Sequence, residues 1–166
     1  MCIRDSGYNV RPTELQAAIG LVQLGRLDQL LLARETLAHA VSGWLQTYAP
    51  WLELIGRGSI GPRFPAVRRS RTHSWMTLPL RVGPDAPVHR AVVVEALEAA
   101  GVETRPIIAG NLARHPGVKQ VAYREAPSMA HCDALLTDSF MIGCHPVLSS
   151  GSLSTLESAI GALATF

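Results

Sequence analysis

The segment Gly7-Tyr8-Asn9-Val10-Arg11-Pro12-Thr13 concentrates side chains that could bind an anion. Tyr8, Asn9 and Arg11 offer a phenol, an amide and a guanidinium directly before a stretch with helical spacing. The N-terminus of a helix favours negative charge, because its first N–H groups are unpaired and its dipole is positive there. These residues therefore predict a phosphate-binding segment, although Asn and Thr before a helix also serve as simple caps.

Two other clusters suggest chemistry that the sequence favours less. His131-Cys132 and Cys144-His145 could together supply four zinc ligands, but adjacent residues on a helix or strand point apart, so we expect no metal site. The arginines between residues 57 and 71 have a single aromatic residue, Phe64, among them, and the formal net charge is only +2. We therefore expect a solvated loop, or contacts to a nucleotide, and no nucleic-acid binding.

The composition is that of an ordinary globular chain. Of 166 residues, 48% are hydrophobic and 17% are charged. No apolar run reaches the roughly 18 residues that cross a bilayer, and the first residues lack the apolar stretch of an export signal. We expect a cytoplasmic protein that binds no membrane. Lys119 is the only lysine, so any reaction that needs a lysine has one candidate.

The elements that must position these residues begin with a long helix. Thr13 and Gln16 fit a capping box, and apolar residues recur at helical spacing to about Tyr48, before Pro50. Gly25 is a candidate for a bend. So much leucine needs more covering surface than the remaining chain offers, and we expect further chain or a second subunit to cover it.

Shorter helices and strands follow this arm. Pro79 indicates an edge strand or a bulge, and Gly101 is placed to end a helix. The spacing predicts a strand over 75–82, a helix over 87–100, a strand over 102–108, a bend over 109–117, a helix over 127–136, a strand over 139–143 and a helix that Ser152 caps and that runs to Ala164. This mixture predicts an α/β chain whose later part is an α+β small domain.

Three segments resemble one known family. Residues 7–20, GYNVRPTELQAAIG, resemble a signature of the DegT/DnrJ/StrS family of pyridoxal-phosphate-dependent sugar aminotransferases. Residues 102–111, VETRPIIAGN, and 137–146, TDSFMIGCHP, resemble two later segments of that family in the same order. The resemblance implies the C-terminal part of a fold-type I pyridoxal-phosphate-dependent transferase.

The resemblance also implies an organisation of the chain. Residues 7–50 would be the end of the large domain with its long interface helices, and residues 51–166 a C-terminal small domain with a short sheet. We interpret residues 1–6 as a non-native segment, because common sequencing-adapter codons would encode Met-Cys-Ile-Arg-Asp.

Family members bind pyridoxal 5′-phosphate across a homodimer interface. The resemblance implies that Asn9 reaches the cofactor phosphate in the neighbouring subunit, with Tyr8 and Arg11 beside it. Transamination also needs a lysine that binds the cofactor covalently. Lys119 lies downstream of every motif, where the family has no such lysine, so we expect no catalytic residue in this chain and no transamination by it alone.

The substrate residues implied by the resemblance lie in the small domain. Arg105 and Asn111 would face a nucleotide-linked keto-sugar, since a guanidinium can bind a diphosphate and an amide can bind a sugar hydroxyl. His145 would lie near the sugar. The implied activity transfers an amino group, from a donor such as glutamate, onto that sugar in the biosynthesis of lipopolysaccharide or a similar glycan.

Two alternatives remain open. A branch of the family, the nucleotide-4-keto-6-deoxyhexose 3-dehydrases, carries histidine instead of the cofactor lysine and removes a C3 hydroxyl. Ile107-Ile108 and Cys144-His145 depart from the pattern of that branch. From another class, the chain could be a non-catalytic ligand-binding or interaction domain, which should cover its own apolar helix.

Overall fold

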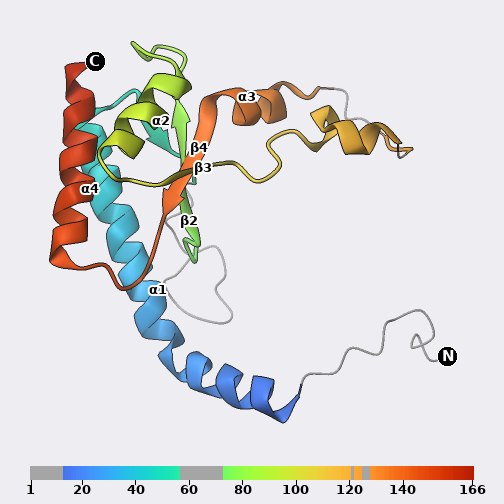
Figure 1. The fold of residues 1–166 in the computed structure, drawn as a ribbon, viewed down its shortest axis with the longest axis vertical. Helices are drawn as coiled ribbons and strands as arrows, with labels where there is room; N and C mark the ends of the chain where they lie inside the picture. Colours follow the sequence, from blue (N-terminus) through green and yellow to red (C-terminus); the bar gives the residue numbers. More distant parts are fainter. Residues whose placement is uncertain (1–12, 57–72, 121, 125–127) are drawn as a thin grey trace.

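A computed structural model describes residues 13–56, 73–120, 122–124 and 128–166. In these residues a sheet of four antiparallel strands packs one face against helices α1, α2 and α4 (Figure 1). The elements are α1 (Glu14–Tyr48), β1 (Leu52–Leu54), β2 (Thr77–Val82), α2 (Arg90–Ala99), β3 (Thr104–Pro106), η2 (Leu112–Arg114), η3 (Pro116–Gln120), α3 (Ala130–Asp138), β4 (Ser139–Gly143), α4 (Ser150–Ala162) and η4 (Leu163–Thr165).

The core lies between the sheet and these three helices. The strand order is β1-β2-β4-β3, and in the central pair Leu78 lies opposite Ile142 and Leu80 opposite Phe140. Because side chains alternate along a strand, these four residues share one face, and each is at most 2% exposed. The helices complete this core with Val41, Leu45, Val93, Leu97, Leu156 and Ile160.

Helix α1 is half buried and half exposed. The predicted capping box is present, with the Thr13 N–H donating to Gln16 Oε1 at 2.8 Å and the Gln16 N–H to Thr13 Oγ1 at 3.3 Å. Its buried residues lie between Leu37 and Leu45, whereas Leu15 and Leu21 are each 71% exposed. The N-terminal part curves away from the sheet (Figure 1). These exposed leucines agree with the expectation of an uncovered arm, as far as the described part of the chain is concerned.

The described helices include none that is long and apolar enough to span a membrane.

The prediction for Pro79 is wrong. Strand β2 is internal, and its register with β4 is continuous, so Pro79 marks neither an edge nor a bulge. Its carbonyl accepts a hydrogen bond from the Ile55 N–H at 2.9 Å, just beyond the last β1 pair, Leu54 with Leu80. The N and O of a strand residue face the same neighbour, so the missing N–H of Pro79 faces the place where β1 ends.

Several predicted boundaries also differ. The strand expected from residue 75 begins at Thr77, because Trp75 has a φ of 44°, in the left-handed region. The helix expected from residue 87 begins at Arg90, and the strand expected over 102–108 is only Thr104–Pro106. The helix expected over 127–136 spans Ala130–Asp138, while the strand over 139–143 is confirmed.

Two helix ends test the predicted caps. Gly101, with a φ of 83°, ends α2 as predicted, since its N–H and that of Val102 donate to the carbonyls of Glu98 and Leu97. At α4 the N-cap is Ser149 and not Ser152. Ser152 instead lies in the first turn and donates its N–H to Ser149 Oγ at 3.1 Å. Strand β1 and the short helices η2 and η3 were not predicted.

The position of the core predicts that substitutions of Leu78 and Leu21 differ strongly in their effect on the free energy of unfolding. Leu78→Ala should lower the free energy of unfolding by about 2–5 kcal/mol, because it leaves a cavity in close-packed surroundings. Leu21→Ala, on the exposed part of α1, should change it by no more than about 0.5 kcal/mol. Urea unfolding followed by circular dichroism measures both, and equal losses would contradict this assignment of the core.

Candidate functional site

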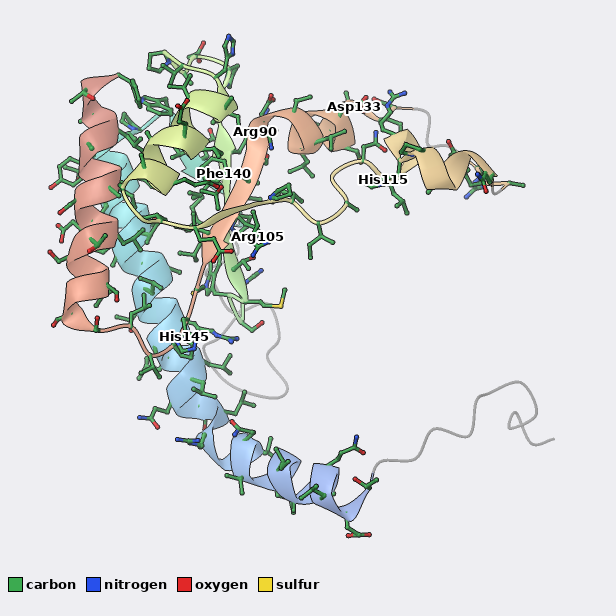
Figure 2. All side chains as sticks on the ribbon, in the orientation of Figure 1. Arg90, Arg105, His115, Asp133, Phe140 and His145 are labelled. Atoms are coloured by element: carbon green, nitrogen blue, oxygen red, sulfur yellow. The ribbon has the colours of Figure 1, made fainter. Side chains whose placement is uncertain are left out.

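The predicted cofactor residues Tyr8, Asn9 and Arg11 lie outside the described residues. What the structure places is the helix that follows them, α1, whose first turn is closed by Thr13 and Gln16. The three predicted substrate residues are all described. Figure 2 shows Arg105 on β3, and His145 beyond β4 beside α1.

Arg105 is exposed at the sheet edge. It lies on β3 opposite Met141 and forms an ion pair with Glu103. Both side chains are more than 70% exposed, so this pair contributes little stability and Arg105 can exchange Glu103 for an anionic ligand. Arg105 also lines a groove of about 700 Å³ between α2 and β3, together with Arg90 and Glu98.

His145 lies in a different cavity. It is exposed directly after β4, and its Nδ1 lies 3.2 Å from the Val147 N and 3.1 Å from the Val147 carbonyl oxygen. Nδ1 accepts from the N–H when the proton of the neutral ring is on Nε2, and donates to the carbonyl when that proton is on Nδ1. The ring borders an apolar groove of about 430 Å³ between α1 and the start of α4, lined by Leu32, Trp44 and Leu153. The structure therefore does not bring His145 and Arg105 into one described cavity.

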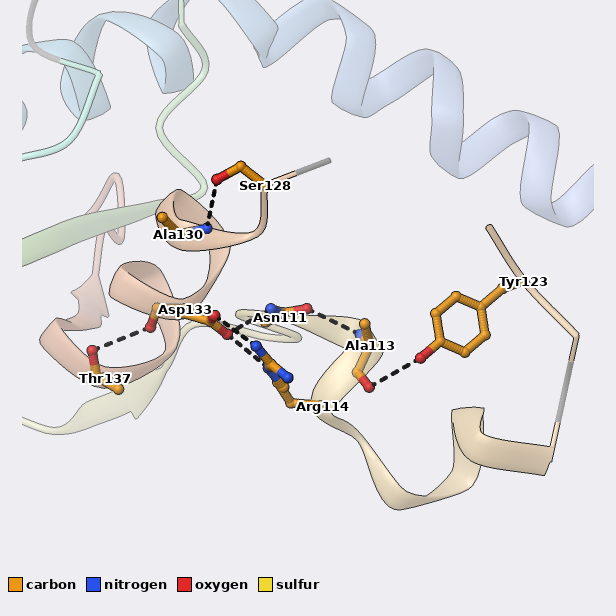
Figure 3. A network of polar contacts seen from close by, with 8 residues as sticks. All are labelled: Asn111, Ala113, Arg114, Tyr123, Ser128, Ala130, Asp133 and Thr137. Carbon is orange, nitrogen blue, oxygen red and sulfur yellow. Dashed lines mark hydrogen bonds and ion pairs between the residues drawn. The ribbon is translucent and has the colours of Figure 1, made fainter. Parts of the chain in front are cut away.

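Asn111 is buried, with 2% of its surface exposed. Its Nδ2 donates to Asp133 Oδ1 at 2.7 Å, and its Oδ1 accepts from the Ala113 N–H at 3.1 Å, which caps η2 (Figure 3). Both polar groups of the side chain are thus engaged within the protein. Direct contact between Asn111 and a sugar stays a prediction, and it would require the amide to leave Asp133 or Ala113.

Asp133 on α3 is the centre of this network (Figure 3). Besides Asn111, it receives two hydrogen bonds from Arg114, Nε to Oδ1 at 3.0 Å and Nη2 to Oδ2 at 2.9 Å. These bonds from Arg114, and then the bond from Asn111, lower the pKa of Asp133 from 3.8 to about 2. We name Asn111, Arg114 and Asp133 the carboxylate clasp.

Sequence reasoning missed Arg114 and Asp133. The available signal was weak: Asn111 and Arg114 are three residues apart after a glycine, and Asp133 lies within the helix predicted over 127–136, in what the structure shows to be the first turn of α3. An aspartate there is equally typical of a residue that only complements the helix dipole. Its choice of partners, 19 and 22 residues away, depends on how the loop folds back.

The remaining candidate chemistry is not assembled. Lys119 lies in η3. Cys132 is half-buried on α3, and Cys144 is buried, with its Sγ donating to the Arg34 carbonyl at 3.7 Å. Burial raises the pKa of Cys144 to about 11, which keeps it a thiol at neutral pH. Among the described residues, no group of three or more metal-ligating side chains converges.

The clasp predicts the acid titration of Asp133. Because its pKa is lowered in the folded protein, its stabilising contribution is present above about pH 3.8 and is lost as the pH falls toward 2. Carbon-detected NMR of Asp133 Cγ should show a midpoint near 2. Arg114→Met should move the midpoint toward 3.8, whereas Arg26→Met, on exposed α1, should not. A midpoint near 3.8 in the unchanged chain would contradict the clasp.

Comparison with known proteins places this fold in a family. A profile of the DegT/DnrJ/EryC1/StrS aminotransferase family matches residues 2–160. Lipopolysaccharide biosynthesis protein RfbH of Salmonella typhimurium is 30% identical over 152 residues, which are 92% of this chain and 32% of that protein. GDP-perosamine synthase of Caulobacter vibrioides is 37% identical over 101 residues, 61% of this chain and 24% of that protein.

A solved structure shows the same arrangement. The E. coli GDP-4-keto-6-deoxy-D-mannose-3-dehydratase, with bound hydrated PLP, superimposes with a TM-score of 0.73 at 26% identity, covering 93% of this chain and 37% of that one. The chain thus spans about a third of the length of the curated relatives it matches. The expectation of part of a fold-type I pyridoxal-phosphate-dependent enzyme is confirmed, and the chain belongs to the DegT/DnrJ/EryC1/StrS aminotransferase family.

Proposed function

We propose that this chain is part of a pyridoxal-phosphate-dependent enzyme that transfers an amino group onto a nucleotide-linked keto-sugar in glycan biosynthesis. The match to the aminotransferase family over residues 2–160 carries this proposal, and the similarity to the lipopolysaccharide biosynthesis protein RfbH along 92% of the chain supports the role in glycan biosynthesis. The Caulobacter relative, GDP-perosamine synthase, supports the aminotransferase reaction. The enzyme would act in the cytoplasm, as a homodimer, with glutamate or a similar amino donor.

The residues of this chain suit the cofactor chemically. Pyridoxal phosphate, when bound, supplies an electron-withdrawing ring that makes bonds at an attached amino carbon easier to break. Its phosphate needs N–H and O–H donors, and Asn9, Tyr8 and Arg11 offer these types just before α1. In this proposal Asn9 donates from its amide to a phosphate oxygen, while Tyr8 and Arg11 flank the cofactor.

Arg105 is the residue best placed to hold the nucleotide sugar. Its guanidinium is exposed and borders the groove between α2 and β3, and among the described residues its ion-pair partner is the exposed Glu103. A diphosphate offers paired oxygens that match the guanidinium fork and would replace Glu103. In the same proposal, His145 orients the sugar from the Nε2 side of its ring, and Asn111 belongs to the loop that joins this site to α3.

A 3-dehydratase is the second candidate. The E. coli 3-dehydratase structure supports it, because it superimposes on 93% of this chain. The two reactions differ in the residue that meets the cofactor, lysine or histidine. In both, Arg105 would bind the nucleotide part of the substrate. The exposed leucines of α1 argue against the third alternative, an independent interaction domain that covers its own helix.

Nucleotide binding tests the substrate class. The chain, titrated calorimetrically with GDP and with dTDP, should bind at least one of them. Arg105→Ala should weaken that binding about tenfold, the expected loss of a charge-assisted bidentate contact. Arg26→Ala, an exposed arginine on α1, should leave it unchanged. If neither nucleotide binds, or if both variants weaken binding equally, the proposed role of Arg105 fails.

A second prediction concerns Lys119. Since it lies in η3 and not in any motif of the family, it should not react specifically with the cofactor. The chain is incubated with equimolar pyridoxal phosphate, reduced with borohydride and digested for mass spectrometry. We expect no phosphopyridoxyl group on Lys119 above the level on an unfolded peptide of the same sequence. Stoichiometric labelling of Lys119 in a folded monomer would overturn the view that this chain lacks the catalytic residue.

A further inference from the structure

We propose that Asp133 is the positioning residue of the loop that follows β3, residues 107–114. Through the carboxylate clasp it would hold this loop against α3 in the conformation that presents Arg105 to the nucleotide sugar. This inference rests on the proposed function, which places Arg105 at the substrate, and it adds a residue that would act without touching substrate or cofactor.

The clasp engages both oxygens of one carboxylate. Oδ1 accepts from Asn111 Nδ2 and Arg114 Nε, and Oδ2 accepts from Arg114 Nη2. All three bonds are 2.7–3.0 Å long and involve at least one charged group. Such bonds are stronger than neutral ones, and the paired bonds from Arg114 also fix orientation. The loop is therefore held at two points, three residues apart.

Close backbone packing reinforces the clasp one turn along α3. Gly110 has a φ of 53°, and a Cβ placed on it would lie 3.0 Å from Leu136 Cα and 2.8 Å from Leu136 Cδ1. Residues 133 and 136 lie on the same side of a helix, so both contacts join the loop to one face of α3. Gly110 allows the loop backbone to lie close to Leu136, and the hydrogen bond from the neighbouring Asn111 to Asp133 holds the loop there.

Among the described residues, the clasp is what links this part of the chain to α3 by polar contacts. The described hydrogen bonds that link residues 107–120 to α3 all end on Asp133. The described backbone bonds of the segment are internal, such as Arg114 N–H to the Asn111 carbonyl and His115 N–H to the Leu112 carbonyl. Loss of the carboxylate would therefore release the loop without disturbing the sheet, because none of the described core residues comes from α3.

Release of the loop would reach Arg105. Strand β3 is an edge strand of three residues, and the loop leaves it immediately after Pro106. The backbone of Arg105 is held by the three-residue pairing of β3 with β4. The chain that follows it is held by the clasp, which restrains the end of β3. In this geometry Asn111 would help to position the loop and would not touch the substrate, because both its polar groups already have partners.

The experiment compares three variants of the full chain. Asp133→Asn removes the charge at constant size, Asp133→Glu restores a carboxylate, and Asp138→Asn removes another α3 carboxylate, whose described partner is Thr137. Hydrogen exchange is measured at the Ala113 N–H, whose acceptor is Asn111, and at the amides of β2 and β4. Binding is measured with the nucleotide, GDP or dTDP, that the unchanged chain binds.

We expect Asp133→Asn to accelerate exchange at Ala113 about tenfold or more while the sheet amides keep their rates. It should also weaken nucleotide binding about tenfold, with partial recovery in Asp133→Glu and no change in Asp138→Asn. A purely structural role would accelerate exchange throughout the sheet as well, and that result would overturn the proposal.

Two other results would also overturn it. Unchanged exchange at Ala113 would show that the clasp does not hold the loop. Faster exchange with unchanged binding would show that the loop does not position Arg105, while the proposed function stands. If the unchanged chain binds neither nucleotide, the proposed function fails, and the exchange measurement alone then decides whether Asp133 holds the loop.

Discussion

The pairing of β2 with β4 is the constraint on which the rest of the structure depends. Its alternating side chains place Leu78, Leu80, Phe140 and Ile142 on one face, where they are removed from water by three helices. Once this face is buried, the outer strands have fixed places: β1 beside β2, and β3 beside β4. The ends of β3 and β4 then determine where Arg105 and His145 emerge.

This arrangement explains why the chain has a core and yet exposes much leucine. The second half of α1 packs with α4 over the sheet, so Leu37, Ala38, Val41 and Leu45 are buried. The first half extends past the sheet and contributes nothing to that core. Helical periodicity is the same along both halves, and only the extent of the sheet decides which half it covers. An arm of this kind is typical of a chain that folds within a larger assembly.

The fold also determines where the predicted substrate residues lie. The three predicted substrate residues lie in different surroundings. Arg105 is exposed at the sheet edge, Asn111 is buried in the clasp, and His145 borders an apolar groove. The carboxylate of Asp133 links the first two settings, because it holds the loop that runs from β3 to η2. The Asn111 amide is the costly part of this network to separate from Asp133, because Asn111 is buried and its Nδ2 would lose its hydrogen-bond acceptor.

The sequence by itself determined the features that depend on a few neighbouring residues. The capping box of Thr13, the helix end at Gly101, the strand over 139–143 and the family motifs all follow from local spacing and backbone preference. Only the tertiary structure decided that Pro79 lies in an internal strand, that Ser149 caps α4, and that Asp133 binds Asn111 and Arg114. Strand order and ion-pair partners are contacts between distant residues, and the periodicity of one segment indicates its buried face without specifying which other segment will cover it.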